Sequence, residues 1–167
     1  MTKLNKTPLG QRTIRFQDCD PYGHLNNAKY IDYMINVRED HLMNEYGLNV
    51  FAMAQIDKRS WLVGHNEIAY LKPANVMEEV VIQTALIDYT DKYVKAEMVM
   101  MNKAKSHVKA VLWTKFYHFD FKSGQGVEHH DELLGLFDNL RVEIDQENVE
   151  QRARFLAREL KGSVPVQ

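Results

Sequence analysis

The sequence is poor in residues that cross-link, break or loosen a chain, with one cysteine, four prolines and eight glycines among 167 residues. The single Cys19 excludes an internal disulfide, which fits the reducing cytoplasm in which we expect the protein. No run of about 18 apolar residues is present, which excludes a membrane-spanning helix. The N-terminus lacks the apolar stretch of a secretory signal, and there is no repeat or linker rich in Gly, Pro or Ser. We therefore expect a single domain over residues 1–167.

Neither sign of charge is in large excess. Lys and Arg total 21 against 23 for Asp and Glu, which gives a net charge of -2. A broad nucleic-acid surface needs a clear basic excess, so we expect no nucleic-acid partner. A small phosphate-bearing ligand held by a few local lysines is compatible with this balance. Hydrophobic residues make up 45% of the chain, which is sufficient for an apolar core.

The first predicted element is a short strand over residues 13–17. Ile14 and Phe16 lie on one face of this segment and polar side chains on the other, which is the period of a strand. Pro21 and Gly23 then mark a loop, because both residues favour turns. The sequence therefore predicts a strand that leads directly into a loop.

A long helix follows this loop. Asn26 or Asn27 is a suitable N-cap, and the apolar pattern continues to about Tyr46, where Gly47 ends it. The first half of the segment is so dense in apolar residues that we expect the helix to be largely buried. These residues are Ala28, Tyr30, Ile31, Tyr33, Met34, Ile35 and Val37.

The middle of the chain predicts an antiparallel sheet. Alternation with a period of two occurs over residues 61–70, 79–86, 93–100 and 107–116. The connections are short, so we expect the strands to pair as a meander with one face on the core. The other face is mixed, but it carries Val81, Val111 and Trp113, which indicates contact with another subunit.

The last part of the chain predicts helices. One is expected over His130–Asp138, and an amphipathic one is marked by Val149, Ala153, Leu156 and Leu160. The simplest packing of these elements is an α+β fold, in which an antiparallel sheet wraps around one long central helix. We expect the core over about residues 10–120 and an extra C-terminal helical segment over about 130–161.

The loop before the helix concentrates the chemically useful side chains. It reads Asp18-Cys19-Asp20-Pro21-Tyr22-Gly23-His24-Leu25-Asn26-Asn27. This segment resembles the active-site region of the hotdog-fold thioesterases, both the 4-hydroxybenzoyl-CoA thioesterase-like branch and the acyl-ACP thioesterase branch. The first branch has an Asp-x-Asp-x-x-Gly loop before its central helix, and the second has Asp-x-Asp-x-Asn-x-His-x-Asn-Asn. The later segment Glu67–Ala74 resembles the second strand of the family and its exit.

The resemblance implies specific roles. The catalytic carboxylate of the family falls on Asp20, and the histidine of the acyl-ACP branch falls on His24. The catalytic asparagine of that branch falls on Tyr22, and a histidine or tyrosine of the other branch falls on Asn27, so the chain departs from the family at both positions. The resemblance also implies a hotdog fold and a homodimer or homotetramer with active sites between subunits.

The residues themselves suit thioester hydrolysis. A helix that begins near Asn27 presents free backbone N–H groups and a positive dipole end to a carbonyl oxygen. Asp20 can activate a water molecule or attack the carbonyl carbon directly, and the sequence leaves both routes open. His24 and Asn27 complete the catalytic candidates. The substrate-binding candidates are Gly23, which permits close backbone approach, Asn26 as a donor, and Tyr30 and Met34 as the floor of an acyl pocket.

Each of these residues also has a structural explanation. Aspartate favours turns and asparagine caps helices, but their combination with Gly23 and His24 favours catalysis. Asp18 points away from Asp20 and is expected to be structural. Cys19 lies between two acids, which raise the pKa of its thiol, so we do not expect a cysteine nucleophile. The loop also fails as a calcium site, because Lys29 stands where a bidentate Glu is required.

We therefore expect a thioester hydrolase that acts on an acyl-CoA or an acyl-ACP. We expect no metal and no other cofactor, since His118, His129 and His130 lack the spacing of a known metal site. Two alternatives remain open. One is a hydratase or dehydratase on the same fold, and the other is a hotdog protein that binds acyl-CoA without turnover.

Overall fold

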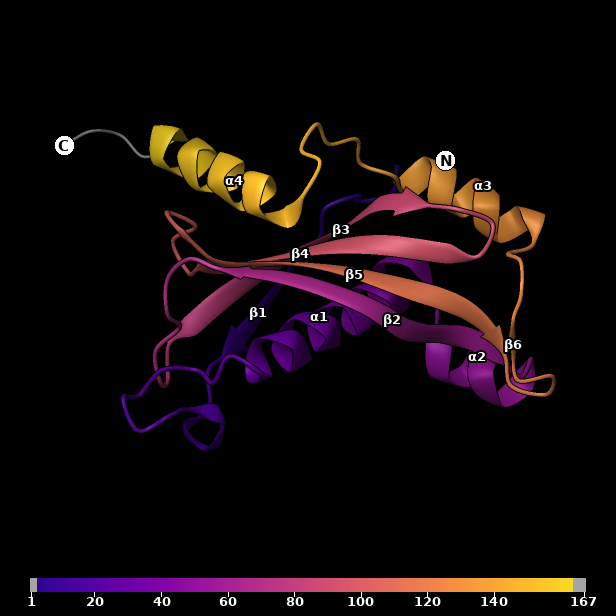
Figure 1. The fold of residues 1–167 in the computed structure, drawn as a ribbon, viewed down its shortest axis with the longest axis horizontal. Helices are drawn as coiled ribbons and strands as arrows, with labels where there is room; N and C mark the ends of the chain where they lie inside the picture. Colours follow the sequence, from indigo (N-terminus) through magenta and orange to yellow (C-terminus); the bar gives the residue numbers. More distant parts are fainter. Residues whose placement is uncertain (1–2, 164–167) are drawn as a thin grey trace.

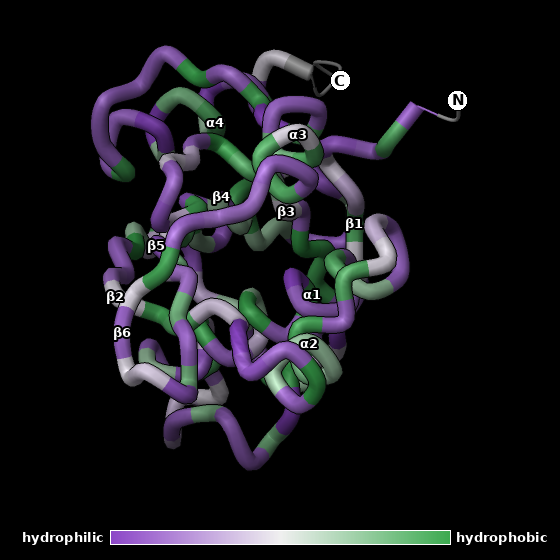
Figure 2. Tube along the Cα trace, turned by 90° about the vertical axis from the view of Figure 1, so that its right-hand side faces the viewer, coloured by the Kyte–Doolittle hydropathy of each residue, from purple (hydrophilic) through white to green (hydrophobic). Residues whose placement is uncertain are grey.

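The computed structural model describes residues 3–163, in which a six-stranded antiparallel sheet curls around helix α1 (Figure 1). In Figures 1 and 2, α1 and α2 lie on one side of the strands and α4 on the other. No helix within the described range combines the length and apolarity needed to cross a membrane. The elements in chain order are β1 (Leu9–Thr13), a 3₁₀ helix (Phe16–Asp18), α1 (Lys29–Tyr46), α2 (Val50–Ile56), β2 (Arg59–Tyr70), β3 (Glu79–Tyr89), β4 (Tyr93–Asn102), β5 (Val108–Asp120), β6 (Gln125–Gly126), α3 (Asp131–Leu140) and α4 (Val149–Ser163).

The strand order is β1-β3-β4-β5-β2, with β6 paired to the end of β5. Strands β3 to β5 form the predicted meander. The expectation that all four segments pair as one meander is wrong for β2, because β2 lies at the far edge and pairs with β5, from Arg59 opposite Asp120 to Tyr70 opposite Ala110. The segment that follows Tyr70 leaves the sheet to pair with the loop before α1, where Leu25 N–H donates to Ala74 O at 2.8 Å.

The inner face of the sheet packs on α1. Met34 and Val37 of α1 are fully buried, and β1 approaches so closely that a Cβ on Gly10 would lie 2.6 Å from Val37 Cγ1. The helix buries one face only, since Asp32 and Asn36 remain exposed, so the expectation of a largely buried helix is wrong. The cause is geometric, because a single sheet covers one side of a helix.

The ends of α1 differ in how well they follow the prediction. Gly47 ends the helix as predicted, with a left-handed φ of 67°. The predicted cap by Asn26 or Asn27 is wrong, because Ala28 takes the cap position and no side chain caps it. The chain instead turns once before the helix, with Lys29 N–H donating to Asn26 O at 2.8 Å.

The predicted strand over residues 13–17 is misplaced. Strand β1 ends at Thr13, and residues 16–18 form a 3₁₀ helix that leaves Phe16 81% exposed. The hydrogen bond from Cys19 N–H to Phe16 O, 3.1 Å long, replaces strand pairing there. The alternation of apolar and polar residues over 13–17 therefore belongs to the turn that follows the strand and not to the strand itself.

The outer face of the sheet is covered by α4. Trp113 is 2% exposed and packs with Val149 and Ala153 of α4. Both guanidinium nitrogens Nε and Nη2 of Arg152 donate to Glu97, at 2.8 and 2.9 Å, and Trp113 Nε1–H donates to the same carboxylate. The expectation that Trp113 and Val111 meet another subunit is therefore wrong, because the same chain buries them.

Candidate active site

The loop before α1 folds back on itself and fixes Asp20. The N–H of Asp20 donates to His24 O at 2.8 Å, and the N–H of Gly23 donates to Asp20 O at 3.0 Å. The Asp20 carboxylate oxygen Oδ1 accepts from the backbone N–H of Tyr22 at 2.9 Å and of His24 at 3.1 Å. Gly23 has a φ of 77°, a conformation that most side chains disfavour. One carboxylate oxygen is thus held by the backbone, which orients the other.

The segment after β2 holds this loop in place through backbone hydrogen bonds. Leu25 N–H donates to Ala74 O, and Val76 N–H donates to Gly23 O, each at 2.8 Å. Lys109 on β5 secures the segment, since its Nζ lies 2.7 Å from Glu78 Oε2 and donates to the Pro73 carbonyl at 3.0 Å. The position of the Asp20 loop therefore depends on a buried lysine far away in the sequence.

A hollow of about 220 Å³ lies between the loop, the start of α1 and the end of β2. Four of the predicted site residues line it together, namely Asp20, His24, Asn27 and Tyr30. The remaining lining residues are Leu25, Tyr70, Leu71, Lys72 and Pro73. The hollow therefore combines one carboxylate, one imidazole, two phenols and the beginning of a helix.

Two tyrosines shape one wall of the hollow. Tyr30 Oη accepts a hydrogen bond from Ala74 N–H at 3.0 Å, and burial raises the pKa of Tyr30, so its phenol stays neutral. The ring of Tyr70 meets the ring of Tyr30 edge to face, with centroids 5.2 Å apart. The Tyr70 hydroxyl donates to Asn27 O at 2.8 Å, which fixes the turn that enters α1.

The start of α1 gives the hollow a positive electrostatic potential. The first N–H groups of a helix have no intrahelical partner, and the macrodipole makes this end positive. Asn27, which precedes the helix, and Tyr30, which lies in its first turn, both line the hollow. Developing negative charge in the hollow is therefore favoured.

The other three predicted substrate-binding residues do not line the hollow. Gly23 shapes the turn, and a Cβ there would meet Val76 at 3.6 Å, so its positive φ is the stronger reason for glycine. Asn26 is exposed and contributes its backbone, as its N–H donates to Asp18 O at 3.0 Å. Met34 is fully buried in the core against the inner face of the sheet.

Asp18 and Cys19 have structural surroundings. Asp18 Oδ2 accepts from the Tyr33 hydroxyl at 2.6 Å, on a different side of the loop from the hollow. Cys19 Sγ donates to Arg15 O at 3.3 Å. Burial and then the charges of Asp20 and Asp18 raise the pKa of the thiol, which disfavours a reactive thiolate.

Two of the histidines considered as metal ligands pack together instead. His118 and His129 are stacked at 4.8 Å, and Trp61 Nε1–H donates to His129 Nε2 at 2.9 Å. Among residues 3–163, no three His, Cys, Asp or Glu side chains converge as metal ligands would. These rings belong to the packing beneath α3.

Tyr70 and Lys72 were not identified as part of the site from the sequence alone. In the structure Lys72 is exposed and lines the hollow, whereas Lys109 is buried against Glu78 and Arg59 lies 3.4 Å from Asp120. The signal for Tyr70 is its place as the last residue of a strand just before the Lys-Pro exit, but its partner Asn27 is distant in sequence.

Comparison with known proteins identifies the family. Residues 14–147 match the thioesterase-like superfamily, and no curated protein matches the chain. The probable thioesterase YbaW from Escherichia coli is similar in structure, with a TM-score of 0.68 and 22% identity over 80% of this chain and 98% of that one. A 1,4-dihydroxy-2-naphthoyl-CoA thioesterase from Synechocystis has a TM-score of 0.72 and 12% identity over 80% and 97%.

A third similar structure is a hypothetical protein from Staphylococcus aureus in complex with CoA. Its TM-score is 0.72 at 10% identity, over 88% of this chain and 94% of that one. Such low identities bear on the fold alone, and they confirm the α+β hotdog architecture, with a curled antiparallel sheet around a central helix. The match over most of the sequence shows that this chain belongs to the thioesterase-like superfamily.

Proposed function

We propose that this chain hydrolyses an acyl thioester of CoA or acyl carrier protein to a free carboxylic acid and a thiol, with Asp20 as general base or nucleophile. The observation that carries the proposal is the Asp20 carboxylate, which lines the hollow at the start of α1 with Oδ1 held by two backbone N–H groups. The membership in the thioesterase-like superfamily and the CoA complex of one structural neighbour support it.

In the general-base route, Asp20 Oδ2 takes a proton from water while the water oxygen adds to the thioester carbonyl carbon. The resulting oxyanion is stabilised by N–H groups at the start of α1, each worth about 3 kcal/mol when preorganised. The C–S bond then breaks, and the departing thiolate takes up the proton. The products are the acid and the thiol.

In the nucleophilic route, Asp20 Oδ2 adds to the carbonyl carbon and expels the thiolate, which leaves a mixed anhydride. Water then hydrolyses the anhydride, which gives the free acid and regenerates the Asp20 carboxylate, and the proton released is taken up by the thiolate. Both routes need the same orientation of Asp20, which its two backbone hydrogen bonds supply.

The other residues of the hollow have supporting roles in this proposal. His24 and Asn27 orient the water or the carbonyl by hydrogen bonding. Tyr30 forms the wall next to the acyl group, while Gly23 and Asn26 shape the loop that holds Asp20. Lys72, exposed at the rim, meets a phosphate of the carrier.

We further propose a homodimer that pairs along β2. This strand is a free edge of the sheet with Leu62 43%, Val63 49% and Tyr70 44% exposed, which is unusual for an unprotected edge strand. The outer face, the other broad apolar surface, is already covered by α4. Because Tyr70 lines the hollow, a partner along β2 adds a wall to it.

The test is thiol release by the wild-type protein from a panel of acyl-CoAs and acyl-ACPs that are short, long and aromatic. Turnover of any member supports hydrolysis, and the preferred carrier follows from the rates. Tight binding of these thioesters without thiol release contradicts the proposal and favours the acyl-CoA-binding alternative.

A further inference from the structure

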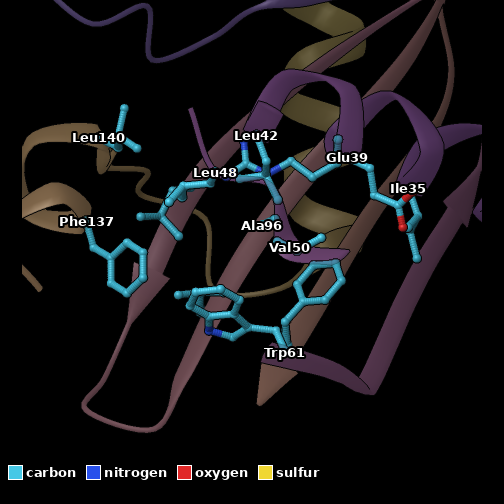
Figure 3. A pocket seen from close by; sticks show the side chains of 13 residues that line it. Ile35, Glu39, Leu42, Leu48, Val50, Trp61, Ala96, Phe137 and Leu140 are labelled. Atoms are coloured by element: carbon cyan, nitrogen blue, oxygen red, sulfur yellow. The ribbon is translucent and has the colours of Figure 1, made fainter. Parts of the chain in front are cut away.

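A separate apolar cavity lies between the second half of α1 and the inner face of the sheet (Figure 3). Its volume is about 100 Å³, which is room for several methylene groups. In Figure 3, Trp61, Leu48 and Phe137 point toward one another across it, and the rings of Trp61 and Phe137 are 6.4 Å apart. The residues that line it are Ile35, Arg38, Glu39, Leu42, Leu48, Val50, Trp61, Leu86, Val94, Ala96, Phe116, Phe137 and Leu140.

Helix α1 runs past both the hollow at Asp20 and this cavity, and it lines each of them. Tyr30 lines the hollow, and Ile35 is the first residue of α1 to line the cavity. At a rise of about 1.5 Å per residue, the cavity begins roughly 7 Å along the helix from Tyr30 and ends, at Leu42, roughly 18 Å from it. Ile31 on α1 and Ile68 on β2 are partly buried and pack on the core cluster that contains both Tyr30 and Ala96.

The walls favour a hydrocarbon. The buried polar group among the lining residues is Arg38, whose Nη1 donates to Thr84 Oγ1 at 3.2 Å and whose guanidinium lies 5.7 Å from the ring centre of Tyr46. These two contacts hold the guanidinium toward Thr84 and Tyr46, neither of which lines the cavity. Glu39 is exposed, and every other lining side chain is apolar.

Helix α3 closes the far end of the cavity. Phe137 and Leu140 are buried, 5% and 3% exposed, and pack with Leu86 of β3. Phe137 also meets the ring of His129 at 5.0 Å, which fixes its position. The size of these two side chains determines how far an occupant can extend.

We propose that the cavity receives the distal part of a linear aliphatic acyl chain whose thioester lies at Asp20, and that Ala96, Phe137 and Leu140 set the chain length. The inference rests on the proposed thioesterase function and names its substrate class. A rigid aromatic acyl group attached at the thioester ends near Tyr30 and does not reach a cavity roughly 7 Å further along α1. A flexible chain of medium length does.

The first test fills the cavity. Ala96→Leu adds a larger side chain at a lining position, and Ala85→Leu makes the same change on the adjacent strand but on the outer face under α4. We expect the ratio of kcat/KM for dodecanoyl-CoA to that for butanoyl-CoA to fall about tenfold or more in Ala96→Leu. Ala85→Leu keeps the wild-type ratio. An unchanged ratio in folded Ala96→Leu, or an equal change in both, overturns the inference.

The second test enlarges the cavity and remains available if Ala96→Leu does not fold. Leu140→Ala removes the far wall, while Leu156→Ala makes the same truncation on α4, which packs on the outer face. The chain-length preference is expected to shift toward hexadecanoyl-CoA in Leu140→Ala by about tenfold relative to dodecanoyl-CoA. Leu156→Ala shows no such shift. The same preference in both variants contradicts the inference.

A binding measurement separates this inference from the proposed function. Trp61 lines the cavity, so a dodecanoic acid that carries bromine at its distal end should quench its fluorescence. We expect quenching in the wild type and in Ala85→Leu, and loss of it in Ala96→Leu and in Trp61→Phe. If the wild type shows quenching but no thiol release, the proposed hydrolase function is contradicted and the binding of an acyl chain in the cavity is supported. If it shows turnover without quenching, only the binding in the cavity is contradicted.

Discussion

The buried Lys109 forms an ion pair with the partly buried Glu78, next to the segment that binds the Asp20 loop. The Lys109 side chain is 2% exposed, and its Nζ lies 2.7 Å from Glu78 Oε2 and 3.0 Å from Pro73 O. The two contacts lie at opposite ends of a segment whose middle binds the loop through Ala74 and Val76. The pair therefore links the sheet to the position of the candidate catalytic carboxylate.

Replacing Lys109 with methionine should impair both stability and turnover. The substitution leaves Glu78 without its counter-ion in a partly buried site, and breaking such a pair costs about 3–5 kcal/mol of the free energy of unfolding. Displacement of the loop should lower kcat by about tenfold to hundredfold at a temperature at which the variant is folded. Denaturant unfolding and thiol-release kinetics measure the two effects.

The chain provides a matched control in its other buried ion pair. Arg152 on α4 pairs with Glu97, far from the hollow. Arg152→Met should therefore destabilise the fold to a similar extent and leave kcat near the wild-type value. Equal losses of kcat in the two variants would mean that Lys109 acts through overall stability alone.

The stacked histidines beneath α3 predict how stability depends on pH. Burial is the main cause that lowers the pKa of His118 and of His129 below the ordinary value of 6.5. Trp61 Nε1–H donates to His129 Nε2, and the Nδ1–H of His129 donates to Thr90 O, so the folded protein holds this ring neutral. Below pH 6.5 the unfolded chain takes up protons that the folded chain does not.

The free energy of unfolding should therefore be maximal above pH 6.5 and decrease as the pH falls below it. Each such histidine contributes a slope of up to about 1.4 kcal/mol per pH unit until the lowered folded pKa is reached. His118→Phe should reduce this slope by up to about 1.4 kcal/mol per pH unit, which corresponds to one proton. Urea titrations between pH 7 and pH 5 measure it, and an identical slope in the variant contradicts the assignment.

The proposed dimer predicts an asymmetry between the two edges of the sheet. Val63→Lys places a charge on the exposed edge strand β2, where a partner strand would lie, and should give a monomer with reduced turnover. Leu9→Lys makes a similar change at the opposite edge, on β1, and should leave the assembly unchanged. Light scattering across a range of protein concentrations measures the mass, and a wild-type monomer rules the dimer out.

The sequence predicted the elements that depend on local pattern. The apolar density from Tyr30 onward and Gly47 located α1, and the alternation over residues 79–116 located β3 to β5. Helices α3 and α4 appeared close to their predicted bounds, because their apolar residues repeat with a helical period. Helix α2 was missed, since its seven residues are too few for a clear period.

The errors concern partners that are distant in the sequence. The position of β2 beside β5, and the cover that α4 gives to Trp113, follow from long-range packing that no local pattern contains. For the same reason the pattern singled out Asp20, His24, Asn27 and Tyr30 but not Tyr70, whose contact with Asn27 joins two separate segments. Met34 was expected in an acyl pocket, but helical phase places it in the core.

The most direct test of the account compares the same substitution at two aspartates in one loop. Asp20→Asn keeps an oxygen that accepts the N–H groups of Tyr22 and His24, so the loop should persist while the base or nucleophile is lost. Asp18→Asn alters only the acceptor for the Tyr33 hydroxyl. With the best acyl thioester of the panel, we predict that kcat falls about hundredfold or more in Asp20→Asn and less than about tenfold in Asp18→Asn. Full thiol release by folded Asp20→Asn would contradict the central role of Asp20.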